Sequence, residues 1–571
     1  MKTKSLYLKI FLAIFLSIFL VFYLNIHDYG LPYFINADET AGIKSLLYFY
    51  GFFTYANQNV VEPIYFPLIN FLSTGFLIFV KNIFTWNYTI SELKDFFYLN
   101  PHLLYKFGRI SSLIFCFLSL IFYYLITKKL KLNNLYILIS FFGLITSYFF
   151  FDVAIVHGKN SLLLFLFLIQ YYFFIKYFFK LEKFGIKSYI ILALLASLAW
   201  GINYWAATPS LYAIALLHFE KFRFKNKENI YLFLILFLVF GALINYVISG
   251  DKIFHHLYTD DFLITYDGLN RVEIFFHDLL NGLKIILNIE KPILYLSILL
   301  FVSKIKYCDG KSKKFLILNV FLILEPILLF ALADGSYPQL RYFGPSIFLI
   351  YILIGFLINL QFVKILRFNN FFLFLSCLLF IFFSYEKILV LKKSKKIIEN
   401  NFTLYEVLNK FSYSNDTLFF TNNMTYRENI KTLNLYKSLL NRNLVKLNPN
   451  ADNKNSLKEI DKKINIIKRA EKKNIFPSSK QHVFFGGEYL IDNHKDFFNY
   501  IKESYKYVAI ISNKSDEFNF LLNNFEVSFK VDSQNVSTVR SISNILEKNF
   551  SLSSISHIEN VGNSISVFKL N

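Results

Sequence analysis

Long apolar runs fill the first two thirds of the chain and stop near Val390. A transmembrane helix needs about 20 consecutive, mostly apolar residues, and several of these runs approach that length. Beyond Lys392 the sequence becomes polar and rich in Lys and Asn. The pattern therefore predicts an all-α polytopic membrane domain over residues 1–391, followed by a soluble domain over residues 392–571.

Taken run by run, the apolar pattern predicts about eleven transmembrane helices. The first ends near Leu24 and has no small-residue cleavage site after it, so we expect it to stay uncleaved. Its Lys-containing N-terminus is expected in the cytoplasm. The others are expected at 107–127, 134–151, 161–178, 188–203, 205–219, 229–249, 292–306, 315–333, 342–360 and 369–388.

The distribution of Lys-rich loops indicates whether the apolar segment Pro63–Val80 crosses the membrane. If it does not cross the membrane, five Lys-rich loops fall on the cytoplasmic side, as the positive-inside rule requires. We therefore expect it to be interfacial or re-entrant, and the amphipathic stretch after Glu39 to be a helix on the membrane surface. The soluble domain is then external, together with loops at 25–106, 152–160, 200–208, 250–291 and 334–341.

Short runs of apolar and β-branched residues predict strands in the soluble domain. They are expected at Thr417–Thr421, Val483–Phe485, Tyr507–Ser512 and Ile565–Phe568. Helices are expected at Lys431–Leu440 and Lys495–Lys506. A small α/β domain follows from this mixture.

Composition and charge agree with a membrane location. The chain is 55% hydrophobic with 71 Phe, more than a soluble protein can keep from water. The formal net charge of +21 is explained by cytoplasmic loops next to anionic lipid, so we expect no nucleic-acid partner. The three cysteines are far apart, which implies neither a disulfide framework nor a Cys-rich zinc site.

Two adjacent carboxylates, Asp38 and Glu39, begin the amphipathic stretch that follows the first span. At the outer membrane face a carboxylate can take a proton from an incoming hydroxyl or hold a divalent cation. The alternative is that Asp38 caps the following helix, with Glu39 favourable at its positive end. Position alone leaves both open.

Further polar residues gather at the predicted outer ends of the spans. Asp152, His157 and Lys159 occupy one external turn, where they bring an acid, a base and a cation together. Arg341 and Tyr342 open a late span, and an external arginine there implies an anionic partner, either lipid phosphate or Asp334. A short loop is polar in any case, and a lysine can extend to the interface, so a structural role is the alternative.

Other candidates carry weaker signals. Glu62 and Asn203 lie in predicted external segments and are candidates for lining a cavity, while Glu325 lies inside an apolar run near its end. The 250–291 loop holds several His and Asp residues, including His277-Asp278, but no diagnostic ligand spacing. We therefore interpret it as a hydrated loop in preference to a metal site.

Four of these features occur in a recognisable order. They are Asp38-Glu39, Glu62-Pro63-Ile64-Tyr65, Phe107-Gly108-Arg109-Ile110-Ser111-Ser112 and Arg341-Tyr342-Phe343-Gly344-Pro345. Over about residues 1–365 this order resembles the GT-C glycosyltransferases that use polyprenyl-phosphate sugars, the class of the protein O-mannosyltransferases and lipid A aminoarabinose transferases. The external turn, often Arg-Pro-Asp in that family, is Gly158-Lys159-Asn160 here, so Asp152 or His157 would replace the second acid.

The resemblance implies an inverting sugar transfer at the outer face of a bacterial inner membrane. Asp38 would be the general base on a glycan, lipid or protein acceptor, and Glu39 would orient the acceptor or share a metal. Arg341, Lys159 and Tyr342 would bind the donor phosphate. Some members of the class need a divalent cation such as Mg²⁺ or Mn²⁺ and others do not, so the metal stays open.

Two other functions are weighed against this one. A polysaccharide ligase or polymerase would use long external loops rich in Arg and His, whereas the first loop here is acidic. A transporter or flippase of lipid-linked glycans predicts mid-membrane polar residues and repeated broken helices. The sequence shows no repeat, and its polar residues gather at the outer ends.

Overall fold

The computed structural model describes residues 65–99, 101–179, 185–202, 207–219, 227–243, 271–332 and 343–360, five strands between 417 and 570, and isolated positions within 16–24 and 374–389. The chain divides into two compact units. The first contains Met1–His27, Asp38–Lys81 and Phe107–Leu391, and the second contains Asp28–Ala37, Asn82–Lys106 and Lys392–Asn571.

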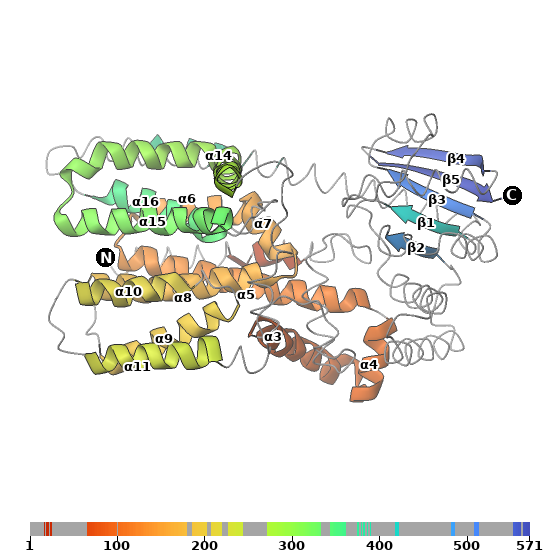
Figure 1. Ribbon diagram of the computed structural model, residues 1–571, viewed down its shortest axis with the longest axis horizontal. Coiled ribbons are helices and arrows are strands. Elements are labelled where there is room, and N and C mark those ends of the chain that lie inside the picture. Colours follow the sequence, from red (N-terminus) through yellow and green to blue (C-terminus); the bar gives the residue numbers. More distant parts are fainter. Residues whose placement is uncertain are drawn as a thin grey trace. The chain divides into compact units, whose positions relative to one another are not determined.

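The described part of the first unit is helical (Figure 1). Its elements are α3 (Tyr65–Lys81), α5 (Pro101–Lys129), α6 (Asn134–Ile145), α7 (Tyr148–Ile155), α8 (Lys159–Phe178), α9 (Ile186–Trp200), α10 (Thr208–Phe219), α11 (Lys227–Phe237) with the π-turn η4 (Leu238–Leu243), α14 (Arg271–Lys304) with the 3-10 turn η6 (Ile305–Tyr307), α15 (Gly310–Leu332) and α16 (Gly344–Asn359). Most of the apolar runs expected to span the membrane are therefore helices.

Three described helices are long and apolar enough to cross a membrane, judged by length and composition. They are Leu68–Trp86, Leu103–Lys129 and Lys159–Phe178. This is compatible with a helical membrane domain, and the count of about eleven spans stays a prediction. The first of the three includes the segment expected to be interfacial or re-entrant; length alone allows it to cross, so that expectation rests on the charge pattern.

Helix α16 is the most deeply buried helix of the described bundle, with every residue from Gly344 to Ile358 buried. Close packing needs glycine: a Cβ at Gly355 would stand 2.4 Å from the ring of Tyr136 on α6. Tyr136 also donates a hydrogen bond to the Tyr351 carbonyl of α16. Small residues at helix contacts are typical of membrane bundles, because close approach of the backbones replaces a hydrophobic driving force.

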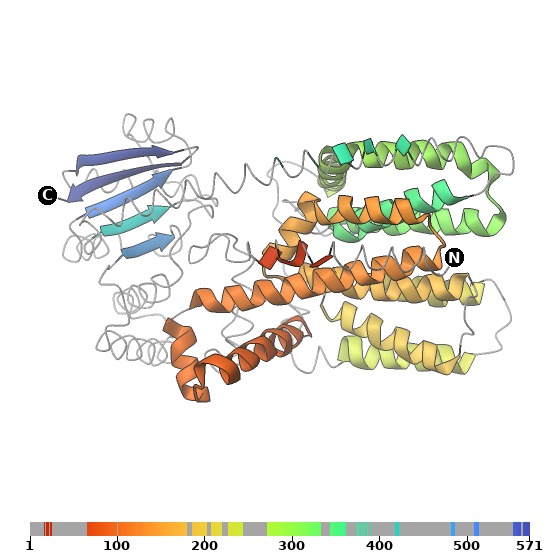
Figure 2. The same cartoon turned by 180° about the vertical axis from the view of Figure 1, so that it is seen from behind.

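Aromatic rings join α5 to α8. The Phe122 ring centroid lies 5.8 Å from those of both Phe165 and Tyr172. Figure 2 shows α5 running alongside α8. Offset and edge-to-face aromatic pairs of this kind add to the free energy of apolar packing. The many Phe residues of the sequence therefore build helix contacts as well as lipid-facing surface.

The prediction of one continuous span over residues 134–151 is wrong. The run 134–151 is divided into α6 and α7 at Thr146 and Ser147. The Thr146 hydroxyl donates to the Phe142 carbonyl at 2.7 Å, and the Ser147 hydroxyl accepts from the Phe150 backbone N–H at 3.0 Å. The Thr146 hydroxyl thus pairs with a backbone carbonyl at the end of α6, and the Ser147 hydroxyl caps the start of α7. These hydrogen bonds allow the chain to turn between the two helices.

The predicted external loop 250–291 is wrong at its C-terminal end. Residues from Arg271 onward belong to α14, which continues to Lys304. The apolar-run criterion missed this first part because polar residues such as His277 and Asp278 interrupt it. A helix of this length measures about 50 Å, well beyond the roughly 30 Å apolar core of a bilayer.

The second unit contains η2 (Asn82–Trp86), α4 (Ile90–Leu99) and a five-stranded sheet. Helix α4 begins with a capping box: the Thr89 N–H donates to Glu92 at 2.9 Å, and the Glu92 N–H donates to the Thr89 hydroxyl at 3.3 Å.

The sheet consists of β1 (Thr417–Thr421), β2 (Gln481–Phe485), β3 (Tyr507–Ser512), β4 (Leu552–Asn560) and β5 (Asn563–Leu570). The strand order is β2-β1-β3-β5-β4, with β2, β1 and β3 parallel and β5 antiparallel to both neighbours. Four strands lie where the sequence predicted them. The helices expected at Lys431–Leu440 and Lys495–Lys506 lie outside the described residues, so the α/β assignment stays a prediction.

Candidate functional site

His157 and Lys159 are the predicted site residues whose side chains the structure describes. They lie in the turn between α7 and α8 and at the first residue of α8. Asp152 belongs to α7, but its side chain lies outside the described part. Six further predicted site residues also lie outside the described residues: Asp38, Glu39, Glu62, Asn203, Arg341 and Tyr342.

The His157 imidazole is buried, at 2% exposure, and is hydrogen-bonded to α3. Asn70 of α3 accepts the Thr74 hydroxyl at its Oδ1 over 3.0 Å, which turns its Nδ2 toward Nε2 of His157, also at 3.0 Å. In this orientation of the amide, Nδ2 donates to Nε2 of the imidazole. The ring is therefore held in one orientation.

The face of the His157 ring packs on Gly108 of α5. A Cβ at Gly108 would stand 2.5–2.7 Å from three ring atoms, a separation that real Cβ atoms do not show. The Phe66 ring of α3 lies nearby, with its centroid 6.5 Å from that of His157. Glycine is required at this position of α5 because the imidazole occupies the space of a side chain.

A second polar contact joins α3 to α5 one helical turn further along each helix. The Ser111 hydroxyl donates to the Ser73 hydroxyl at 2.7 Å. Arg109, the residue after Gly108 in α5, is buried at 1% exposure. The Pro-led segment, the arginine-led helix and the predicted external turn are thus brought together around His157.

Lys159 occupies a position where an anionic neighbour is favourable. It is half-buried at the first residue of α8, and the N-cap residue Gly158 offers no side-chain acceptor. The N-terminus of a helix carries partial positive charge, so a lysine there adds to the local positive potential. Phosphate is the kind of group that such a helix end and an ammonium bind together.

The sequence interpretation missed Asn70, Thr74 and Gly108 as partners of His157. Asn70 and Thr74 stand four residues apart within an apolar run, which places them on one helix face. That spacing was the available signal. Gly108 gave none, because a glycine within a span has several ordinary explanations.

Glu325 is a carboxylate of α15, within the predicted span 315–333. Its Oε2 is buried and has no hydrogen-bond partner, while the Thr208 side chain of α10 bonds the carboxylate. Pro326 follows directly and lies inside the helix. Burying an ionisable group within a span costs free energy. Glu325 therefore stays a candidate functional residue.

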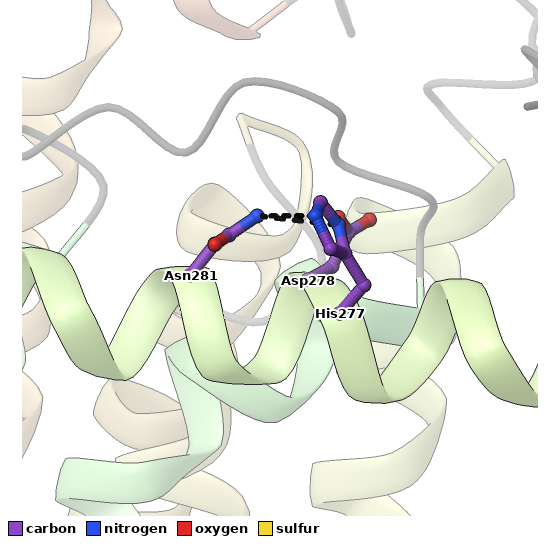
Figure 3. A network of polar contacts seen from close by, with 3 residues as sticks. All are labelled: His277, Asp278 and Asn281. Atoms are coloured by element: carbon purple, nitrogen blue, oxygen red, sulfur yellow. Dashed lines mark hydrogen bonds and ion pairs between the residues drawn. The ribbon is translucent and has the colours of Figure 1, made fainter.

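A third polar cluster lies on α14, where the sequence interpretation expected a loop (Figure 3). His277 is 52% exposed and its Nδ1 lies 3.3 Å from Oδ1 of Asp278, which is fully buried. The Asn281 side-chain amide lies 3.2 Å from Nδ1 and 3.3 Å from Nε2 of His277. His277 and Asn281 stand one turn apart and share a helix face.

Within the described residues no group of three or more His, Cys, Asp or Glu side chains is arranged to hold a metal ion. The polar contacts of His157 position α3, α5 and the turn before α8, and the positive charge of Lys159 at the start of α8 suits that helix end to an anion. A general base for the predicted chemistry would have to come from elsewhere in the chain. Neither a protein-family model nor a curated protein sequence matches this chain.

Proposed function

We propose that this protein is an integral-membrane glycosyltransferase that moves a sugar from a polyprenyl-phosphate donor to a cell-envelope acceptor. Asp38 is its general base, Glu39 orients the acceptor, and Arg341, Lys159 and Tyr342 bind the donor phosphate. The finer organisation belongs to the same proposal. It comprises about eleven spans, an external α/β domain and a site at the outer face of a bacterial inner membrane.

One observation carries the proposal beyond the sequence pattern. His157 joins Asn70 of α3 and Gly108 of α5, so the turn bearing Lys159 lies against two segments that the resemblance treats as parts of one site. These segments are separated along the chain, since the partners Asn70 and His157 are 87 positions apart in the sequence. Their convergence supports a single polar region at that end of α8.

The chemistry balances without a further reactant. Asp38 takes the proton of the acceptor hydroxyl as its oxygen attacks C1 of the sugar from the face opposite the phosphate. The bond from C1 to the phosphate oxygen breaks, and polyprenyl phosphate leaves with the electron pair. A positioned base contributes about 10²–10⁴-fold, and fixed cations at the leaving phosphate contribute further.

The apolar surroundings suit a lipid-linked donor. Large apolar side chains are exposed along α3 and α5, so a long polyprenyl tail can remain in the bilayer. The charged reaction centre stays at the end of these helices, where water and a polar acceptor arrive. This division of the substrate between lipid and water favours transfer at the membrane surface.

The test is release of polyprenyl phosphate by the purified full-length chain, using a panel of polyprenyl-phosphate sugars and a cell-envelope extract as acceptor. Asp38→Asn should lower the release rate by about 10²–10⁴-fold with an unchanged melting temperature. Unchanged release in Asp38→Asn overturns the base assignment. Transbilayer movement of the lipid-linked sugar without release would identify a flippase instead.

A further inference from the structure

Lysines gather at the tip of the helical hairpin that α14 and α15 form. Helix α14 ends at Lys304, η6 follows, and α15 begins at Gly310, so the two helices run side by side in opposite directions (Figure 1). The segment 304–314 carries five lysines and one acid, Asp309. Ser312 hydrogen-bonds Asp309, and the buried Lys304 donates to the Leu357 carbonyl of α16. The remaining four lysines are exposed or half-buried, which leaves the tip positively charged.

An exposed apolar stripe begins beside these lysines and follows α15. Its four members share one helix face and are 37–57% exposed: Ile317, Phe321, Leu324 and Leu328. Lys313 precedes Ile317 by one helical turn on this face. Glu325 borders the stripe, but its carboxylate bonds the Thr208 side chain of α10 and its Oε2 is buried. The exposed face of α15 is therefore apolar, with a cation at one end.

Helix α14 repeats this arrangement in the opposite direction. Four of its apolar side chains are 50–64% exposed: Tyr295, Ile298, Leu299 and Val302. The exposed Lys306 follows Val302 by four residues, so both stripes lead to lysines at the same tip. On α15 the stripe from Ile317 to Leu328 measures about 16 Å, close to the roughly 15 Å of one leaflet's apolar core. The lysines therefore stand where a lipid whose acyl chains follow the stripe carries its phosphate.

We infer that the tip of the α14–α15 hairpin binds an anionic phospholipid, with the phosphate at Lys306 and Lys313 and the acyl chains along the exposed stripe of α15. Ammonium groups bind phosphate as point charges. A zwitterionic lipid carries its own cation beside the phosphate and gains less from these lysines. The net charge of the chain explains only a general attraction to anionic lipid, whereas the stripe with its lysines selects one face. The inference does not rest on the proposed sugar transfer.

Charge favours a lipid over a second copy of this chain as the occupant of the stripe. Two copies in one membrane have the same orientation. A symmetric contact through this face would place both lysine tips at one level, where like charges repel. A lipid phosphate at the tip has the opposite charge, and its acyl chains need no matching side chains.

The experiment is native mass spectrometry of the delipidated full-length chain in detergent. It is titrated with dioleoyl phosphatidylglycerol or with dioleoyl phosphatidylcholine, which has the same acyl chains. Phosphatidylglycerol should bind at least 10-fold more tightly. The Lys306→Gln, Lys313→Gln double variant should bind it about 10–30-fold more weakly, because each lysine near a lipid head group contributes about fivefold. Phe321→Gln, at an exposed position, should weaken both lipids alike.

The matched control is the Lys129→Gln, Lys187→Gln double variant. It also removes one half-buried and one exposed lysine, from the end of α5 and the start of α9, and should bind both lipids as the parent does. Equal affinity of the parent for the two lipids would overturn the site. Equal weakening by the two double variants would also overturn it, because the attraction would then be spread over the surface. A mass of two chains that returns to one chain in Phe321→Gln would assign the stripe to a second copy. Sugar transfer is not measured, so failure of the proposed function leaves these results unchanged.

Discussion

The imidazole of His157 occupies the space into which a side chain at Gly108 would project, with three ring atoms within 2.7 Å of the Cβ position. Gly108→Ala should therefore destabilise the protein by about 1–3 kcal/mol, the usual cost of overpacking a well-packed contact. Thermal unfolding in detergent measures it. Gly310→Ala is the matched control, because nothing lies within 4 Å of its Cβ position. Equal melting temperatures for both variants would contradict the close contact.

The Asn70–His157 hydrogen bond should be visible as a coupling free energy. Asn70→Ala leaves Nε2 buried without its donor, at a cost of about 1–3 kcal/mol. With His157→Ala and the double variant, a thermodynamic cycle should give a coupling of about 0.5–3 kcal/mol. As a control, Ser297→Ala is combined with His157→Ala in a second cycle. The Ser297 hydroxyl donates to the Leu294 carbonyl of its own helix, so the two changes in unfolding free energy should add. If the unfolding free-energy changes of Asn70→Ala and His157→Ala simply add, the hydrogen bond between the two side chains does not contribute to stability.

The sequence predicted helices and strands well where one periodic pattern persisted. Strands such as Thr417–Thr421 follow from apolar and β-branched residues alone, and α8 follows from an unbroken apolar run. The break at Thr146-Ser147 depends on which hydroxyl bonds which backbone group, and an apolar run does not carry that information. The N-terminal half of α14 was missed because an amphipathic helix and a polar loop share their composition.

The candidate site was predictable only as a set of residue types. His157 and Lys159 were found because they share one short turn, but the partners of His157 come from α3 and α5 and depend on tertiary packing. The full burial of Asp278 on α14 likewise depends on tertiary packing, which the local sequence does not carry. Asp38 and Arg341 stay predictions from sequence order.

Asp309 should make stability depend on pH at the start of α15. The Ser312 hydroxyl and N–H hydrogen-bond this carboxylate and hold its pKa below the ordinary value. A pKa lowered by folding stabilises the protein above the unfolded-state pKa and loses that contribution as the pH falls through the folded-state pKa.

Asp309→Ala should therefore cost about 1 kcal/mol at pH 7, the usual value of a helix cap. The difference from the parent should shrink once the pH falls below the folded-state pKa. Unfolding by denaturant at a series of pH values measures it. Asp309→Asn keeps a cap acceptor without the charge and should stay near the parent at pH 7. A cost for Asp309→Ala that does not change with pH would contradict the charged cap.

The predicted topology can be tested with alkaline phosphatase fusions, which are active only outside the cytoplasm. Fusions after residue 60 and after residue 400 should both be active, because the first loop and the C-terminal domain are predicted to be external. A fusion after residue 183, in a predicted cytoplasmic loop, should be inactive. Inactivity at residue 400 would overturn the topology and, with it, a common location for Asp38 and the sheet domain.

The two ends of α8 offer a matched pair for the donor phosphate. Lys159 is its first residue, whereas Lys176 lies in its last turn, with its ammonium 5.7 Å from the Tyr172 ring and 5.6 Å from the Phe173 ring. A charge-assisted contact is worth about 1.5–3 kcal/mol, so Lys159→Ala should lower kcat/KM for the lipid donor by roughly 10–100-fold. Lys159→Arg should recover part of this loss, because it keeps the positive charge. Lys176→Ala should stay within about twofold of the parent, because losing a cation–π contact at the far end costs little. Equal losses for Lys159→Ala and Lys176→Ala would show that both act through the stability of α8, and the donor phosphate would then have to be bound without Lys159.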